Sequence, residues 1–307
     1  MQTSRQTTTV LLLILCVFFW GSVFPVAKII LTDMSNVSLA VLRFIISIAG
    51  LGIYCLLTRE KWPTLTIQHY LALTLLGIIG IGGFNMGLFS GLKTTTPTNG
   101  ALIMALSPLT TTLLSALMAG KLPSLKQGVS LLVSLLGVCI VITHGHLSQL
   151  VKLQINQGDL YIMAAMLTWC CYTLFSQRMM TVMTPIMFTL ITMITGTLAL
   201  LVICLASQVS PMTEMLQLPA FSMILLLYIS IFATVLGYLF WINGVKHLGA
   251  ARTSVFYNLL PVFAALVSYL FGQPLTLDQI LGMVVVLAGL SISKLNLNFL
   301  RQPQREI

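Results

Sequence analysis

Residues 91–120 read GLKTTTPTNGALIMALSPLTTTLLSALMAG, and residues 244–272 read GVKHLGAARTSVFYNLLPVFAALVSYLFG. Each stretch opens on Gly-x-Lys, reaches a proline in the middle of its apolar run (Pro108 and Pro261), and closes on a glycine. The similarity continues into the apolar run that follows each stretch. Self-similarity of this kind inside apolar segments indicates a membrane protein built from two duplicated halves.

Composition places the chain in a membrane. Of its 307 residues 58% are apolar and only 7% are charged, whereas about a quarter of the residues in a soluble domain are charged. The net charge of +9 does not indicate a nucleic-acid partner, because the charges stand singly between apolar runs rather than in a basic stripe. All six cysteines fall inside apolar runs, so we expect neither a disulfide framework nor a Cys-x-x-Cys metal site.

Ten apolar runs have the length of transmembrane helices, which need about 20 residues. A helix satisfies all of its own backbone groups in lipid, and the runs lack the alternation of a β-barrel strand. The first run continues past Trp20 to Leu31 and no small-x-small cleavage site ends it, so we interpret it as a retained span and not as a cleaved signal peptide. The predicted spans are 8–31, 37–57, 69–92, 97–119, 127–143, 158–180, 184–207, 221–243, 250–271 and 277–295.

The distribution of Lys and Arg sets the orientation. Of 15 such residues, Lys93 and Lys152 lie on one side, and Lys28 and Arg43 lie inside spans, which leaves 15 − 4 = 11 on the side of the termini. We therefore expect both termini in the cytoplasm. Five spans per half make equivalent helices antiparallel, so residues 1–150 and 151–307 form inverted-topology repeats.

These residues resemble the drug/metabolite transporter superfamily, specifically its EamA-type members. The motifs that carry the resemblance are Trp20-Gly21 in the first span, LRF at 42–44 in the second, the Ser107-Pro108 run in the fourth, and NLLPVFAAL in the ninth. The family usually has Gly-Glu after the fourth and ninth spans, where this chain has Gly-Lys and Gly-Gln. That difference puts in doubt any coupling role of those acids but leaves the fold expectation intact.

The resemblance implies a ten-helix carrier with a central cavity lined by spans 1, 3, 4, 6, 8 and 9. It also implies transport of amino acids, related metabolites or drugs, commonly as export, with no cofactor. Uncharged polar residues are concentrated in or beside these spans, where each bonds a neighbouring helix or faces a wet cavity. They are Asn85, Asn99, Ser107, Tyr172, Tyr238, Asn243, Tyr257 and Asn258.

Lys28 and Arg43 are the cations inside predicted spans. Each either extends to the outer interface or attracts a substrate carboxylate. Trp20 and Trp169 either stack on an apolar or cationic substrate or serve as packing and interface residues. No carboxylate lies at mid-membrane depth, which disfavours a proton antiporter built on a buried acid.

Three prolines, Pro25, Pro108 and Pro261, lie within spans 1, 4 and 9. Each removes a backbone hydrogen bond, so it makes either a hinge that exposes carbonyls to substrate or a static kink. Because Pro108 and Pro261 are repeat mates, we favour the hinge.

An enzyme is disfavoured, because neither a Gly-x-Ser-x-Gly nor a His-Glu-x-x-His motif is present, and no metal cluster is expected. We predict an inner-membrane carrier that exports amino acids or related metabolites by alternating access. A multidrug or apolar-compound exporter, and a passive channel or a membrane scaffold, remain the alternatives.

Overall fold

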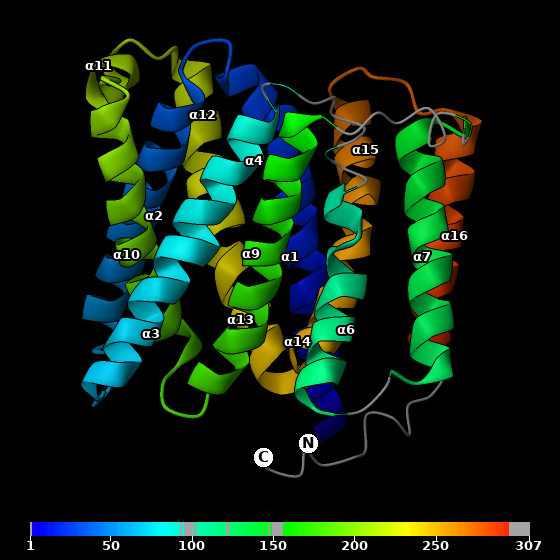
Figure 1. Cartoon of the computed structure of the whole chain (residues 1–307). Coiled ribbons are helices and arrows are strands. Elements are labelled where there is room, and N and C mark those ends of the chain that lie inside the picture. The colour runs from blue at the N-terminus through cyan, green and yellow to red at the C-terminus, as the bar shows by residue number, and fades with distance from the viewer. Residues whose placement is uncertain are drawn as a thin grey trace.

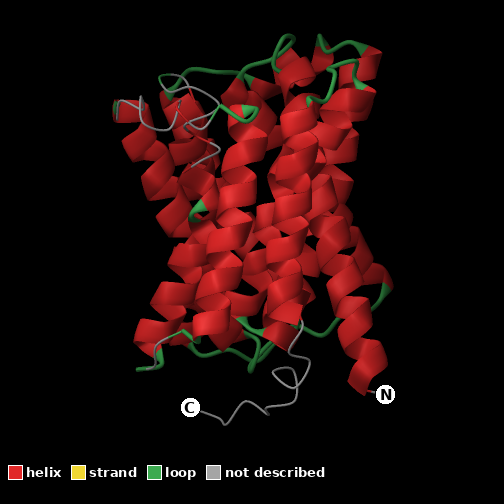
Figure 2. Cartoon of the chain, turned by 90° about the vertical axis from the view of Figure 1, so that its right-hand side faces the viewer, coloured by secondary structure: helices red, strands yellow, loops and turns green. Residues whose placement is uncertain are grey.

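The computed structural model describes residues 2–92, 94, 100, 103–120, 123–146, 148 and 156–294. Within these ranges every regular element is a helix, and the helices run roughly side by side in one bundle (Figure 2). Eight described helices are long and apolar enough to cross a membrane, and the shorter apolar helices Ile103–Met118 and Leu277–Ile292 complete the set. The predicted all-helical fold is confirmed.

The first half contributes five crossings, each within a few residues of its predicted bounds where described. They are α1 (Gln2–Ile30), α2 (Asn36–Leu57), a third crossing made of α3 (Ile67–Gly77), the π-helix η1 (Ile78–Gly83) and α4 (Phe84–Leu92), then α6 (Ser107–Met118) and α7 (Leu125–Thr143).

The second half repeats this order. Its crossings are α9 (Gln157–Met179), α10 (Pro185–Ala206), an eighth crossing made of α12 (Ala220–Tyr228), the π-helix η2 (Ile229–Leu236) and α13 (Gly237–Leu248), a ninth made of α14 (Ala250–Ser254), the 3₁₀-helix η3 (Val255–Leu259) and α15 (Leu260–Leu270), and finally α16 (Leu277–Lys294). A short helix, α11 (Pro211–Leu216), precedes the eighth crossing.

Equivalent helices of the two halves run in opposite directions. In Figure 1 the chain enters α1 at the lower end of the bundle, whereas α9 begins at the upper end and runs down to the loop that leads to α10. The inverted two-repeat architecture predicted from the odd number of spans per half is therefore confirmed.

Local sequence signals explain where the helices begin and end. Ser124 and Gln127 form a capping box at α7, and Asn156 and Asp159 form one at α9. The glycines that closed the two similar stretches, Gly120 and Gly272, follow the fourth and ninth crossings with φ of +62° and +85°. This left-handed geometry favours glycine over residues that carry a Cβ, which explains the repeated position.

Glycines also allow the closest helix contacts. A Cβ on Gly87 would lie 2.9 Å from the Tyr161 carbonyl oxygen of α9, so the third and sixth crossings approach closely. The fifth and tenth crossings, side by side at the right of Figure 1, pack in the same way: a Cβ on Gly137 would lie 2.5 Å from the Val286 nitrogen.

One feature shared by the third and eighth crossings was not predicted. Each contains a π-helix, η1 and η2, and these crossings are repeat mates. A π-helix replaces i→i+4 bonds with i→i+5 bonds and is frequent at functional sites. The paired η1 and η2 therefore mark the third and eighth crossings as specialised.

The prolines occupy two kinds of position. Pro25 lies inside α1, as predicted. Pro108 and Pro261, however, lie in the first turns of α6 and α15, which follow a turn at Leu106 and the 3₁₀-helix η3. Proline is tolerated in a first turn because its missing N–H has no intrahelical partner there. These two prolines therefore start new helical segments instead of kinking continuous helices.

Candidate functional site

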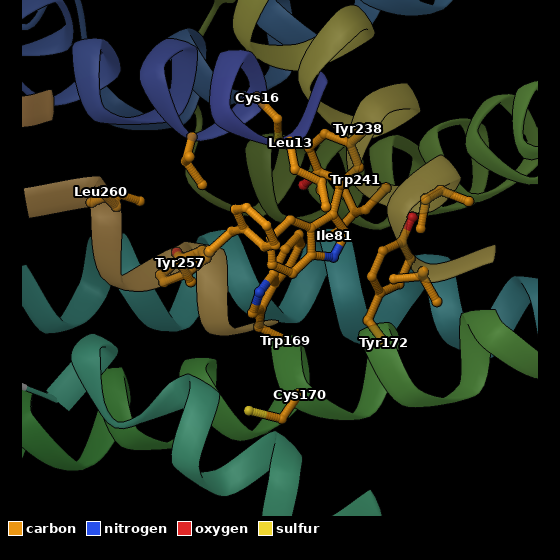
Figure 3. Packing of buried hydrophobic residues seen from close by; sticks show 14 of the residues in the cluster. Leu13, Cys16, Ile81, Trp169, Cys170, Tyr172, Tyr238, Trp241, Tyr257 and Leu260 are labelled. Atoms are coloured by element: carbon orange, nitrogen blue, oxygen red, sulfur yellow. The ribbon is translucent and has the colours of Figure 1, made fainter. Parts of the chain in front are cut away.

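Six aromatic side chains meet where the two halves face each other. We call them the aromatic cluster: Trp20, Trp169, Tyr172, Tyr238, Trp241 and Tyr257. The centroids of rings that contact each other within it are between 5.1 Å (Trp20 to Trp241) and 6.3 Å (Trp169 to Tyr257) apart. Trp20 of α1 has ring contacts with four members from the second half, and the fifth, Tyr172, contacts Trp169 and Tyr238. Figure 3 labels these five residues beside Leu13 and Cys16 of α1. The first half also contributes Phe84, whose ring centroid lies 5.3 Å from that of Trp169.

Hydrogen bonds fix the polar ends of these rings. Trp20 Nε1 donates to the Ala233 carbonyl oxygen at 2.7 Å, and Ala233 belongs to η2. Trp241 Nε1 donates to Thr173 Oγ1 at 3.3 Å. The Trp20 indole therefore bonds a backbone carbonyl of a π-helix, a geometry that is frequent at functional sites. This bond joins α1 of the first half to the π-helix η2 of the second half.

Two glycines make room for the cluster. A Cβ on Gly80 of η1 would lie 2.6 Å from Cβ of Tyr172, and a Cβ on Gly237 would lie 2.5 Å from Nε1 of Trp20. Separations below 3 Å are not tolerated without movement of one group. The third and eighth crossings therefore each present a glycine, in or directly after a π-helix, to a ring of the opposite half.

Arg43 on α2 lies beside the cluster. Its Nη2 donates to Asn85 Oδ1 at 2.9 Å, and its guanidinium carbon lies 4.8 Å from the centroid of the Phe44 ring. Asn85 is buried, and its Nδ2 donates to the Ile81 carbonyl oxygen of η1 at 2.7 Å. Phe44 in turn lies 6.2 Å from Tyr238, ring to ring. Arg43 is thus connected to both the cluster and η1.

The two predicted cations have different surroundings. Lys28 is exposed in the last turn of α1. Arg43 is half-buried among the fully buried residues Phe44 and Ser47. The structure therefore separates them: Lys28 fits the interfacial interpretation, and Arg43 is the cation next to the cluster.

The remaining predicted polar residues are either buried, half-buried or outside the described residues. Ser107 and Asn258 are buried, and Ser107 lies 3.7 Å from the Cys170 sulfur, whereas Asn258 Oδ1 has no hydrogen-bond partner in the described structure. Asn243 is half-buried in α13, next to the cluster residues Tyr238 and Trp241 in sequence. Asn99 lies outside the described residues. Trp241 was not predicted, because in sequence it is one more aromatic residue in an apolar run.

The rings occupy the centre in this conformation, and two pockets lie away from it. A pocket of about 90 Å³ is lined at the ends of α2, α4 and α10 by residues that include Asn36, Ser90 and Ser207. A second, of about 360 Å³, opens between α2 and α10 beside Ile45 and Thr197. Where the resemblance implies a central cavity, the described residues place the packed aromatic rings of the cluster.

Metal chemistry has no support in the described ranges. No group of three or more His, Cys, Asp or Glu side chains is close enough to hold an ion there. The six cysteines are free thiols. What the site offers instead is a set of aromatic faces and one guanidinium.

The chain is similar to known transporters along most of its length. The model of the EamA-like transporter family matches residues 7–143 and again residues 156–294. The uncharacterized transporter YyaM of Bacillus subtilis is 34% identical over 88% of each chain. A probable amino-acid metabolite efflux pump of Salmonella typhimurium is 27% identical over 92% of this chain and 93% of its own. One protein of known crystal structure shares the fold with a TM-score of 0.74 at 18% identity, covering 97% of this chain and 99% of its own.

Proposed function

This chain belongs to the EamA-like transporter family, within the drug/metabolite transporter superfamily, and we propose that it exports amino acids or related metabolites by alternating access. The protein is a multi-pass membrane transporter. The choice of solute and the direction of transport are the parts that go beyond family membership. The Salmonella relative named as an amino-acid metabolite efflux pump supports both.

The observation that carries the proposal is the aromatic cluster at the junction of two inverted halves. Inverted repeats allow two nearly equivalent packings, one open to each side of the membrane. The Trp20 ring is held to the second half by a single hydrogen bond, to the Ala233 carbonyl oxygen, so the rings of the two halves can part at the cost of few polar contacts. We propose that the present conformation is closed and that solute enters between the rings when the halves rock apart.

The candidate contact residues are those of the cluster together with its polar neighbours. We propose that Trp20, Trp169 and Tyr257 provide the apolar walls. Arg43, Asn85 and Asn258 supply the polar contacts. The junctions before Pro108 and Pro261, with the π-helices η1 and η2, are the elements proposed to move, since segment boundaries absorb backbone change.

Two alternatives make different predictions. A multidrug or apolar-compound exporter needs the aromatic faces but has no use for Arg43. A passive channel needs a continuous wet path, which the packed cluster disfavours. We also propose an inner-membrane location with both termini in the cytoplasm, because 11 of the 15 Lys and Arg residues fall on that side.

Reconstitution into liposomes tests the proposal. Purified protein is reconstituted, and uptake of a radiolabelled amino-acid mixture is measured with and without an imposed pH gradient. We expect saturable uptake that unlabelled amino acids compete away and apolar organic cations do not. Competition by the cations alone would favour the multidrug reading, and uptake that rises linearly with concentration would favour a channel.

A further inference from the structure

Arg43 has only part of the bonding that a guanidinium in a membrane protein needs. A guanidinium carries five N–H donors. Only the bond from Nη2 to Asn85 Oδ1 links it to another side chain, and Nε is buried with no hydrogen-bond partner in the described structure. A charge held inside a membrane protein is costly and normally pairs with an opposite charge or lines a functional path.

No carboxylate balances this charge in the described ranges. The acids lie at helix ends and have other partners there: Glu214 accepts from the Ser35 backbone nitrogen, Asp33 from Ser222, and Glu60 from Thr184. Asp159 caps α9, and Asp278 lies in the first turn of α16.

We propose that Arg43 is an anion subsite that binds the carboxylate of the transported solute, and that Asn85 occupies this subsite when no solute is present. The inference rests on the proposed transport function and deepens it by specifying the solute. The solute has one carboxylate and an apolar body, since the guanidinium lies beside the Phe44 ring and, through it, the aromatic cluster.

The shape of the guanidinium supports a carboxylate over a point-like anion. Nε and Nη2 lie on the same edge of this planar group, and a carboxylate can accept from both at once. The amide oxygen of Asn85 satisfies Nη2 but leaves Nε without a partner. A carboxylate that displaces this oxygen satisfies both donors and supplies the missing charge. Asn85 is therefore a neutral substitute that a stronger ligand can replace.

Asn85 also connects the subsite to η1, one of the elements proposed to move. Its Nδ2 donates to the Ile81 carbonyl oxygen at 2.7 Å, and Ile81 lies in the π-helix η1. A solute that displaces the Asn85 amide from Arg43 acts on the side chain that holds this carbonyl. In this way carboxylate binding is transmitted to η1, which packs against the cluster through Gly80 and Tyr172. Asn85 is thus a positioning residue as well as a placeholder.

Matched ligands test the subsite. The probes are the standard amino acids, their carboxamides, which lack the carboxylate, and their N-acetyl derivatives, which keep it but lack the ammonium. Dissociation constants are measured by calorimetry on the purified full-length protein. We expect at least one carboxylate to bind about 10- to 100-fold tighter than its carboxamide, the range of a charged hydrogen-bonded pair. Retention of that preference by the N-acetyl derivative assigns it to the carboxylate.

Substitutions test whether the preference for a carboxylate over its carboxamide depends on Arg43. Arg43→Gln is expected to remove the preference for carboxylate over carboxamide. Asn85→Asp places an internal carboxylate against Arg43 and is expected to weaken carboxylate binding at least about 10-fold more than carboxamide binding. Arg178→Gln is the matched control, because Arg178 is also an arginine over a Phe ring, at 5.4 Å from Phe175, but is exposed at the end of α9.

The outcomes separate the two proposals. The subsite is overturned if the wild-type protein binds every carboxylate and its carboxamide with equal affinity. It is also overturned if the preference for carboxylate survives both Arg43→Gln and Asn85→Asp. In either case saturable transport would still support the carrier. Absence of saturable transport of every probe in liposomes overturns the transport proposal itself. If the Arg43→Gln protein does not fold, the Asn85→Asp protein alone decides whether the subsite exists, because its side chain still places an oxygen acceptor beside the Arg43 guanidinium.

Discussion

The replacement Gly80→Ala tests whether the closed aromatic centre is held by tight packing. Gly80 lies in η1, and the added methyl carbon would stand 2.6 Å from both Cβ and Cγ of Tyr172. Tyr172 is fully buried and is stacked on Trp169, with ring centroids 5.6 Å apart. The ring therefore has no room to retreat without disturbing the rest of the cluster.

The magnitude follows from the cost of overpacking. Adding a methyl group to a well-packed core costs about 1–3 kcal/mol. If that cost falls on the closed conformation alone, its population relative to an open one drops about 5- to 150-fold. Alanine also favours a helix over glycine by about 1 kcal/mol, and a control must remove this contribution. Gly52→Ala in α2 serves, because a Cβ there meets nothing within 4 Å.

Cysteine labelling measures the opening. Cys170 is fully buried beside Ser107 and the cluster, and the other five cysteines are replaced by serine so that it reacts alone. We expect Gly80→Ala to raise the maleimide reaction rate of Cys170 about 5- to 150-fold over Gly52→Ala, with a lower melting temperature. Equal labelling rates and equal melting temperatures in the two variants would refute the packing argument.

Two further predictions concern stability. Trp20→Phe keeps a ring in the cluster but loses the 2.7 Å bond to the Ala233 carbonyl oxygen, so the free energy of unfolding should fall by about 0.5–1.5 kcal/mol; an unchanged thermal melt would contradict this. Gly137→Ala should lower the melting temperature because its Cβ would lie 2.5 Å from the Val286 nitrogen. A Cβ on Gly128 of the same helix has nothing within 4 Å, so Gly128→Ala should raise the melting temperature slightly. A lower melting temperature for Gly128→Ala than for Gly137→Ala would show that α7 and α16 do not pack as described.

Helix number and repeat symmetry could be predicted from the sequence, because lipid leaves the backbone few alternatives. Runs of apolar residues must be helices there, and an odd number of them in each half forces the inversion. Gly120 and Gly272 were visible as repeat mates, and their left-handed φ values explain why glycine recurs.

The π-helices and the membership of the cluster could not be predicted in the same way. The segments Ile78–Gly83 and Ile229–Leu236 have no residue pattern that distinguishes π from α geometry. Which side chains face the centre depends on the rotation of each helix about its axis, and packing between helices sets that rotation. For this reason Trp241 was missed, and Lys28 and Arg43 had equal standing until their surroundings were known.

Counterflow tests the carrier mechanism most directly. Liposomes containing the protein are loaded with an excess of an unlabelled solute that the reconstitution screen identifies, and a trace of the labelled form is added outside. A site that faces one side at a time predicts a transient internal accumulation of label above the outside concentration, abolished when the internal load is omitted. Label that only equilibrates, at a rate indifferent to the internal load, would contradict alternating access.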